Sequence, residues 1–409
     1  MGSTPANLES SLSVPSVQEL ASQRPNRVPA RYIRDEDGDD IIGTNPSHPS
    51  LRVPFIDMAK LVNADTQQHE LQKLHLACKN WGVFQLVNHG LPNTSLKKMG
   101  NQVERFFELP LQEKKRWAQR PGSLEGYGQA FVTSDDQKLD WNDMIFLKCL
   151  PIQDRKLDLW PQNPPEFRGT LERYSEDIRE VTISIVKFIT MSLGIQDTHI
   201  SESFREGLYS IRMNCYPPCP EPERVLGIVA HADNSGITLL LDCADFSGLQ
   251  FLKDKTWVNV EPIEGAIVVN IGQILEVMSN GIYKAPVHRA VVNKLKERFS
   301  IVTFCYPSPH TDIGPSNELI GEGNVAIYKK LTHAKYFSKF FNRDLDESMA
   351  PKSLQSKKRK SIGESSSAVQ EVFRSIEHAT YSVKLGAMLG VGWRWHWAVC
   401  HYAWAYHVS

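Results

Sequence analysis

The sequence predicts a β core of the sandwich, jelly-roll or barrel type, with helices packed on its outside. From residue 208 onward, about eight short strand-like runs follow one another within roughly one hundred residues, separated by Gly, Pro, Asn and Asp. Before that point, apolar residues recur mostly at the helical spacings of three and four. Helices first and strands second is not the alternating order that parallel βαβ units require.

Composition and charge exclude several classes of protein. The chain has 409 residues, of which 41% are hydrophobic and 23% charged, as is usual for globular proteins. Its net charge of -1 provides no field that would attract a phosphate backbone, so we do not expect nucleic acid as a partner. The first residues lack the apolar segment of a secretory signal, and the seven scattered cysteines do not form a disulfide framework. We therefore expect a cytoplasmic protein with reduced thiols.

The first half predicts five elements from its periodicity. The spacing of the apolar residues predicts each element, and glycines and prolines predict where the elements end. The expected elements are a strand at 53–58, a helix through 71–78, a strand at 81–90, a helix after Asn93 that ends before Pro110, and a longer helix from about Thr170 to Gly194.

Composition divides the chain into four segments. They are an N-terminal arm (1–50), a helical region (51–205), the β domain (206–345) and an atypical C-terminal extension (346–409) that we expect to be disordered. The extension begins with the basic run 357–360, which we interpret as a solvated linker, with a nuclear address as the alternative. Its last part is rich in Trp, but Arg394 and three histidines interrupt it, so we expect no membrane anchor.

The motif that indicates chemistry is His231-Ala232-Asp233, together with His288. His231 and Asp233 lie two positions apart at the end of a strand-like run, so both side chains can project to the same side. His288 begins a later strand. Two imidazoles and one carboxylate on one face of an octahedral ion leave the opposite positions open, as in non-haem Fe(II) oxygenases. An H-x-D by itself is more often a polar pair at a strand end.

Two further strands carry alternating polar residues that suit a small acid. Arg298 and Ser300 share one face of a strand, and a guanidinium beside a hydroxyl fits the far carboxylate of a dicarboxylate. Arg212, Asn214 and Tyr216 alternate in the same way on an earlier strand. The alternative in each case is a polar side of the strand that faces solvent.

Together these motifs resemble the plant 2-oxoglutarate- and Fe(II)-dependent dioxygenases, specifically the specialised-metabolism branch that contains codeine O-demethylase and the senescence-related oxygenases. The similarity extends in order from about residue 10 to residue 345, through WGVFQLVNHG, MNCYPPCP, HADNSGITLLL and ERFSIVTFCYPSP. The resemblance assigns the family's iron ligands to His231, Asp233 and His288. Its 2-oxoglutarate motifs correspond to Arg298, Ser300, Asn214 and Tyr216.

The resemblance implies a mainly β fold with helical flanks, in which an N-terminal α/β region packs on a double-stranded β-helix, or jelly roll. It also implies Fe(II), 2-oxoglutarate as cosubstrate and O2, with ascorbate as a candidate reductant. The expected protein is a monomeric dioxygenase that oxidises a small plant specialised metabolite or hormone precursor by hydroxylation, O-demethylation or desaturation. Two alternatives stay open: a non-catalytic small-ligand-binding protein on this fold, and an oxidase of the same fold that does not use 2-oxoglutarate.

Candidates for the organic-substrate pocket follow from alternation and loop composition. If Arg298 points inward, Val302 and Phe304 do so too and could form a wall. Tyr127 and Phe131, in the glycine-containing stretch EGYGQAF, are candidates for a lid over the opening. Each of these side chains could equally be ordinary packing.

Two other patterns are rejected as metal sites. His310-Thr311-Asp312 is a second H-x-D, but it lies among prolines, and no R-x-S follows a later histidine. Cys215 and Cys219 are separated by two prolines and lack the second cysteine pair that would complete a zinc site. We expect these cysteines to be structural.

Overall fold

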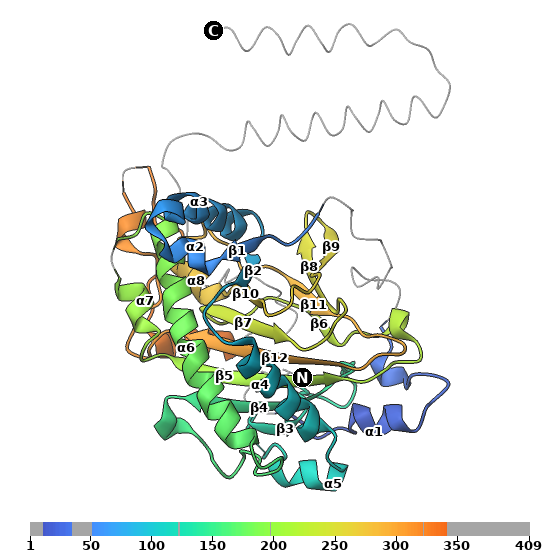
Figure 1. Ribbon diagram of the computed structural model, residues 1–409. Helices are drawn as coiled ribbons and strands as arrows, with labels where there is room; N and C mark the ends of the chain where they lie inside the picture. Colours follow the sequence, from blue (N-terminus) through green and yellow to red (C-terminus); the bar gives the residue numbers. More distant parts are fainter. Residues whose placement is uncertain (1–10, 35–50, 122, 197, 322, 342–409) are drawn as a thin grey trace, which may run out of the picture. The chain divides into compact units, whose positions relative to one another are not determined.

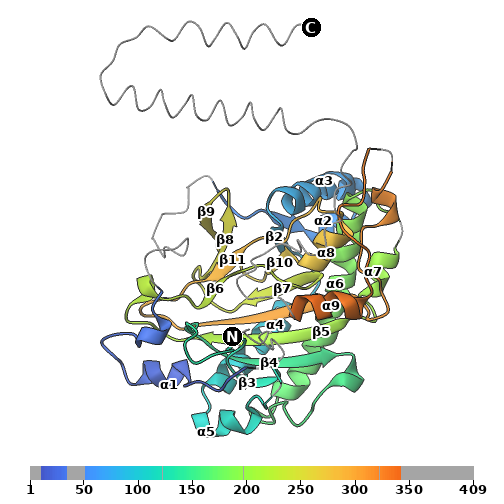
Figure 2. The same cartoon turned by 180° about the vertical axis from the view of Figure 1, so that it is seen from behind.

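The computed structural model describes residues 11–34, 51–121, 123–196, 198–321 and 323–341. In this part of the chain two β-sheets face each other, and helices cover the outer side of the larger sheet (Figures 1 and 2). The predictions for 346–409, including the basic run 357–360, lie outside the described residues.

The elements of the described residues follow the order that the sequence predicts, with additions. The helices are α1 (Val17–Ser22), α2 (Met58–Val62), α3 (Ala64–Asn80), α4 (Asn93–Phe107), α5 (Leu111–Lys114), α6 (Phe167–Ser192), α7 (His199–Ser203), α8 (Gln273–Met278) and α9 (His333–Phe341). The strands are β1 (Phe55–Asp57), β2 (Val83–Val87), β3 (Gly126–Gly128), β4 (Asp143–Leu150), β5 (Leu208–Tyr216), β6 (Ile228–His231), β7 (Ile237–Asp242), β8 (Leu249–Lys253), β9 (Thr256–Asn259), β10 (Ile267–Ile271), β11 (His288–Ala290) and β12 (Arg298–Tyr306).

The strands form one large and one small sheet. The larger sheet has the order β1-β2-β10-β7-β12-β5-β4-β3, and the smaller has the order β6-β11-β8-β9. Only β1 and β2 pair in parallel among the described strands. Two facing, mainly antiparallel sheets with helices outside confirm the expected mainly β fold with helical flanks, consistent with a jelly-roll core.

Strand β12 shows how alternation separates the packed core from the space between the sheets. Ile301 and Cys305 point to the outer face, where the Cys305 sulfur lies 3.3 Å from the Thr182 hydroxyl of α6. Val302 and Phe304 point the other way and line a pocket between the sheets. Because successive side chains take opposite faces, one strand supplies both the core and the site.

The long helices lie where their apolar faces can be buried. Helices α4 and α6 lie across the outer face of the larger sheet (Figure 1), and their apolar residues join its core. Helix α4 starts at Asn93 and ends before Pro110, and α6 ends just before Gly194, which has φ +80°. Such a φ favours glycine as a helix stop. The predicted elements of the first half are therefore present.

Strand β4 was not predicted. Its sequence DMIFLKCL is almost continuously apolar, and a short apolar run does not distinguish a buried strand from a helix. β4 pairs with β5 inside the larger sheet, so this sheet takes strands from both 51–205 and 206–345. The segment boundaries given by composition stay a prediction.

The described part of the N-terminal arm packs on the rest of the fold. The buried carboxylate of Asp143 accepts hydrogen bonds from the Ser16 hydroxyl (2.6 Å) and from the backbone N–H groups of Val17 and Gln18 (both 2.9 Å). The Tyr32 ring meets the buried Trp141 edge-on at 5.2 Å between ring centroids. These contacts fix residues 11–34 beside the loop that leads into β4.

Two findings bear on membranes and on thiols. Within the described ranges, no helix has both the length and the apolar character that a bilayer crossing requires. Six of the cysteines lie in these ranges, and all six are free thiols, including Cys215 and Cys219.

Replacing Phe106 by Ala tests the packing of the helical layer. The Phe106 ring is fully buried, and its ring neighbours are Phe107, Trp117, Tyr127 and Phe167. We expect the free energy of unfolding to fall by about 3–5 kcal/mol, measured by urea denaturation, because the truncation leaves a cavity. The control Leu295→Ala, at a side chain that is 84% exposed, should change it by less than about 0.5 kcal/mol. Equal midpoints for the two variants would contradict this packing.

Candidate active site

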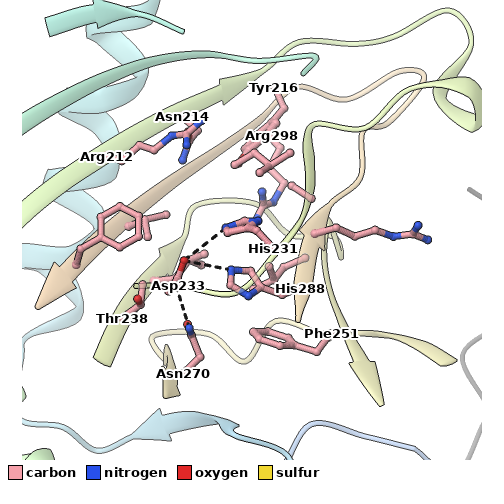
Figure 3. Close-up of a pocket in the computed structure, with 17 residues that line it drawn as sticks. Arg212, Asn214, Tyr216, His231, Asp233, Thr238, Phe251, Asn270, His288 and Arg298 are labelled. Carbon is pink, nitrogen blue, oxygen red and sulfur yellow. Dashed lines mark hydrogen bonds and ion pairs between the residues drawn. The ribbon is translucent and has the colours of Figure 1, made fainter. Parts of the chain in front are cut away.

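Three predicted side chains meet between the two sheets. Oδ1 of Asp233 lies 3.4 Å from Nε2 of His231 and 3.7 Å from Nε2 of His288 (Figure 3). All three donor atoms lie within 4.8 Å of one another. Among the described residues, no second group of three His, Cys, Asp or Glu side chains lies this close together, so the H-x-D at His310 has no third ligand beside it.

Strand pairing brings the two histidines together. His231 ends β6, His288 begins β11, and the two residues are direct partners in the antiparallel ladder. Directly opposed residues project to the same face, and here the ring centroids are 4.3 Å apart. Asp233 follows β6 by two residues and returns to that face. The ladder therefore joins positions that are distant in the sequence.

The donor set fits a single metal ion. Nδ1 of His231 lies 2.8 Å from the backbone oxygen of Val229, and Nδ1 of His288 lies 3.1 Å from that of Pro286. When Nδ1–H donates to these carbonyls, Nε2 keeps its lone pair and points at Asp233. Ligand atoms about 2 Å from one ion are roughly 3 Å apart on neighbouring octahedral positions. The two distances from Asp233 to the histidines, 3.4 and 3.7 Å, need only a small contraction.

Charge in the cluster favours an anionic Asp233. Burial alone would raise the pKa of this carboxyl, but His288 and His231, with a hydrogen bond from Asn270, hold it well below its usual range. Burial and the neighbouring His231 lower the pKa of His288 to about 4. Burial also opposes the charged form of His231, but the hydrogen bond and charge of Asp233 outweigh it and raise its pKa. A carboxylate and a neutral imidazole are the forms that bind metal.

Asn270 is a site residue that the sequence analysis missed. Its side-chain amide donates to Oδ2 of Asp233 at 2.9 Å, from strand β10 (Figure 3). This bond fixes the carboxylate so that Oδ1 faces the two histidines. The only signal in the sequence is one polar residue within the apolar run AIVVNI.

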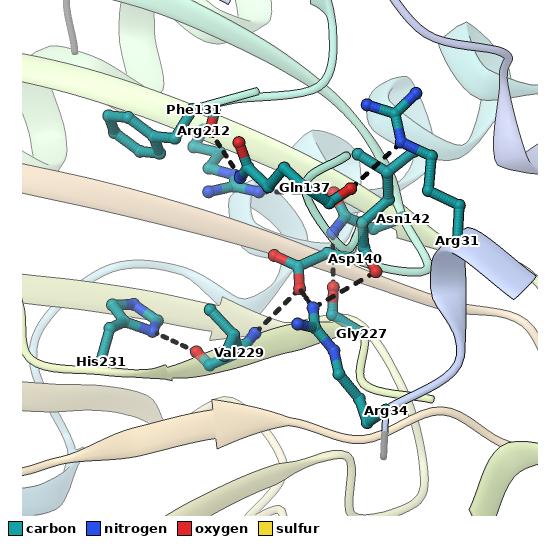
Figure 4. A network of polar contacts seen from close by, with 11 residues as sticks. Arg31, Arg34, Phe131, Gln137, Asp140, Asn142, Arg212, Gly227, Val229 and His231 are labelled. Atoms are coloured by element: carbon teal, nitrogen blue, oxygen red, sulfur yellow. Dashed lines mark hydrogen bonds and ion pairs between the residues drawn. The ribbon is translucent and has the colours of Figure 1, made fainter. Parts of the chain in front are cut away.

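A network of polar contacts reaches the Nδ1 side of the His231 ring (Figure 4). The carbonyl of Val229 accepts from His231, while the N–H of Val229 donates to Oδ1 of Asp140 at 3.1 Å. Asp140 also pairs with Arg34 at 2.7 Å. The N-terminal segment is thereby connected through one carboxylate and one peptide unit to the orientation of His231.

The four residues of the R-x-S and N-x-Y motifs lie on adjacent strands. In the pairing of β12 with β5, Arg298 is opposite Tyr216 and Ser300 is opposite Asn214. The Asn214 amide donates to the Ser300 hydroxyl at 3.1 Å, and the Arg298 guanidinium lies 5.1 Å from the centre of the Tyr216 ring. Asn214, Tyr216 and Arg298 line the same pocket as the histidine cluster (Figure 3), while Ser300 is buried behind this lining and contacts it through Asn214.

Arg298 can receive a carboxylate. Burial disfavours its charged form, but Asp242 and Tyr216 outweigh burial and raise its pKa above the ordinary value. Its Nε is buried and has no hydrogen-bond partner. A buried donor without a partner is costly, and Arg298 lines the same pocket as the histidine cluster, so its guanidinium could bind the far end of an acidic ligand held at the metal.

Arg212 adds a second cation to the pocket. Its Nε donates to Oδ1 of Asn214 at 2.7 Å, and its Nη2 donates to Oδ1 of Asn142 at 3.3 Å. Burial lowers the pKa of this guanidinium. Among the described residues no carboxylate forms an ion pair with Arg212 within 4.0 Å. The polar face that the sequence predicts on β5 therefore points inward.

The four pocket candidates divide into two groups. Val302 and Phe304 line the pocket, as alternation predicts. Tyr127 lies in the buried aromatic cluster around Phe106, and Phe131 lies on a loop with its side chain 38% exposed. Neither is in the pocket lining, so their role as a lid stays a prediction. Alternation located the wall residues because they lie on a strand, while a loop has no such periodicity.

Comparisons with known proteins agree with this geometry. Residues 53–164 match the family model described as "non-haem dioxygenase in morphine synthesis N-terminal", and residues 208–307 match the 2OG-Fe(II) oxygenase superfamily. Protein SRG1 of Arabidopsis thaliana is 42% identical over 82% of this chain and 95% of its own length. Codeine O-demethylase of Papaver somniferum is 39% identical over 83% of this chain and 95% of its own length.

A solved structure extends the similarity to the fold. The crystal structure of JOX2 in complex with 2OG, Fe and JA superposes with a TM-score of 0.74 at 30% sequence identity, covering 84% of this chain and 98% of JOX2. The chain belongs to the 2OG-Fe(II) oxygenase superfamily. It is a 2-oxoglutarate- and Fe(II)-dependent oxygenase.

Removing the carboxylate of the cluster tests the candidate metal site. We expect Asp233→Ala to lower both Fe(II) binding and Fe(II)-dependent succinate formation by more than about 100-fold, because a direct ligand matters more than the residues that orient it. Equilibrium dialysis and a succinate assay measure the two effects. Asp312→Ala is the matched control, since it removes the exposed carboxylate of the other H-x-D. Equal losses in both variants, or none in Asp233→Ala, would refute the site.

Proposed function

We propose that this oxygenase acts on a small plant specialised metabolite or hormone precursor, with His231, Asp233 and His288 as the iron ligands. The observation that carries the proposal is the convergence of the three donor atoms within 4.8 Å on one side of a pocket. The other side of this pocket carries buried cations and apolar side chains. Three ligands on one face of the ion leave room for the cosubstrate and for O2.

The cosubstrate is held at both ends. Arg298 and Ser300 bind the far carboxylate of 2-oxoglutarate, and Asn214 and Tyr216 complete this side of the pocket. When bound, iron and 2-oxoglutarate supply the oxidising chemistry, in which O2 is reduced while 2-oxoglutarate loses CO2 and becomes succinate. The protein's part is to orient both reagents and the substrate, so that oxidation occurs at one carbon.

The substrate contacts follow from the rest of the lining. Val302, Phe304 and Leu240 offer an apolar surface, while Arg212 offers hydrogen-bond donors near the cluster. A mainly apolar molecule with a few oxygen atoms suits such a pocket. Relatives include codeine O-demethylase and a flavonoid 7-O-demethylase of Ocimum basilicum that is 42% identical. Among the three outcomes, we therefore favour oxidation of a methoxy carbon that leads to O-demethylation.

Composition and the described cysteines bear on where the enzyme acts and on its partners. The net charge of -1 supports a protein that does not bind nucleic acid, and the free thiols of the described cysteines support a cytoplasmic location. A monomer that acts without a membrane completes the proposal. Ascorbate is proposed as the reductant that keeps iron ferrous between turnovers.

Incubation of the purified protein with a plant metabolite extract tests the proposal. With Fe(II) and 2-oxoglutarate present, we expect individual metabolites to gain one oxygen or lose one methylene by mass, with one succinate formed for each molecule changed. The matched control omits only 2-oxoglutarate, and oxygen uptake is recorded in parallel. Product formation that is equal without 2-oxoglutarate would contradict the proposal and support an oxidase.

A further inference from the structure

The 2-oxoglutarate anchor already has a carboxylate partner within the protein. Nη2 of Arg298 donates to Oδ2 of Asp242 at 2.6 Å. Both side chains are shielded from water, with 2% of Arg298 and 13% of Asp242 exposed. An ion pair at this depth is weakly screened, so it balances most of the charge that Arg298 would offer to a ligand.

Asp242 is fixed in the position that makes this contact. It is the last residue of β7, on the face that Thr238 and Leu240 present to the pocket, and it lies opposite Ser300 in the ladder. Its other oxygen, Oδ1, accepts from the backbone N–H of Ala244 at 3.2 Å. With one oxygen used by the turn and the other by Arg298, the carboxylate cannot easily swing away.

Arg298 is held from its other side by backbone. A Cβ added to Gly248 would come within 2.5 Å of Cδ and 2.7 Å of Nε of Arg298, so the arginine lies directly against this glycine. The Tyr216 ring lies 5.1 Å from the guanidinium carbon. This packing on two sides confines Arg298 without help from Asp242. The carboxylate of Asp242 is therefore not needed to direct the arginine, and its main effect is electrostatic.

We propose that Asp242 is an internal competitor for the anchor: it occupies part of the Arg298 guanidinium, as the far carboxylate of 2-oxoglutarate would, and thereby lowers the affinity for the cosubstrate. This inference rests on the proposed assignment of Arg298 as the anchor. An incoming carboxylate must share one buried cation with a fixed anion, which reduces the attraction that a free arginine would provide. The enzyme then becomes saturated only at higher 2-oxoglutarate concentrations.

The test is Asp242→Asn, which removes the charge but keeps an oxygen for the turn. The dissociation constant of 2-oxoglutarate is measured by calorimetry on the Fe(II)-loaded protein without oxygen, so turnover is not needed. We expect it to fall on the order of threefold to tenfold. The KM for 2-oxoglutarate should fall in parallel, while kcat changes little. An unchanged or higher dissociation constant would overturn the proposal.

Two controls separate this effect from general charge and from the function itself. Asp245→Asn removes the same charge three residues later, from a side chain that is 79% exposed and pairs with Lys296, and it should leave the dissociation constant unchanged. Arg298→Lys should weaken binding. If Arg298→Lys has no effect, the anchor assignment fails. If it weakens binding and Asp242→Asn does not strengthen it, only the competition fails.

The melting temperature with and without 2-oxoglutarate tests the proposal even if Asp242→Asn is less stable than the wild type. Without its partner, Arg298 is a buried unpaired cation, so the free variant should melt at a lower temperature than the wild type. 2-Oxoglutarate would then supply the missing anion, and at equal concentration it should raise the melting temperature more in the variant. An equal or smaller rise than in the wild type would count against competition.

Discussion

The pairing of β6 with β11 is the constraint on which the site depends. It places His231 opposite His288, so that two imidazoles far apart in the sequence share one face of the sheet. A shift of this ladder by one residue would turn one histidine to the other face of the sheet. Asp233 adds the third donor from two residues beyond the end of β6, and Asn270 holds that carboxylate from the larger sheet. The two sheets therefore both contribute to one donor set.

Charge balance is the second organising feature of the pocket. Two arginines, the buried Arg298 and the partly buried Arg212, lie on the side opposite the histidines, and of these two only Arg298 has a carboxylate in direct contact among the described residues. Burying cations is costly unless anions or hydrogen-bond acceptors compensate them. The pocket meets this cost with Asp242, with the amide oxygens of Asn214 and Asn142, and with the acidic cosubstrate that the family uses. Affinity for small acids and stability of the free protein are thus linked.

Most of the fold and the centre of the site could be predicted from the sequence, because both depend on regular alternation. Period-two runs gave the strands from β5 to β12, and H-x-D and R-x-S lie on such strands, where spacing fixes the face. Strand β4 was not predicted because its apolar run has no period. The roles of Asn270 and Asp242 were not predicted because they depend on which strands are neighbours. One sequence does not show which strands pair or in what register. The lid role of Tyr127 and Phe131 was inferred from glycine content, which does not determine where a side chain points, so it stays a prediction.

The most direct test of the account is an anaerobic titration of the purified full chain, first with Fe(II) and then with 2-oxoglutarate. If the three donors hold one ion with open positions on the opposite face, one Fe(II) should bind per chain. One 2-oxoglutarate should then chelate it, and a weak visible absorption band should grow and saturate at one equivalent. Binding of both reagents without this band would contradict the account, because the oxoacid would then lie away from the metal.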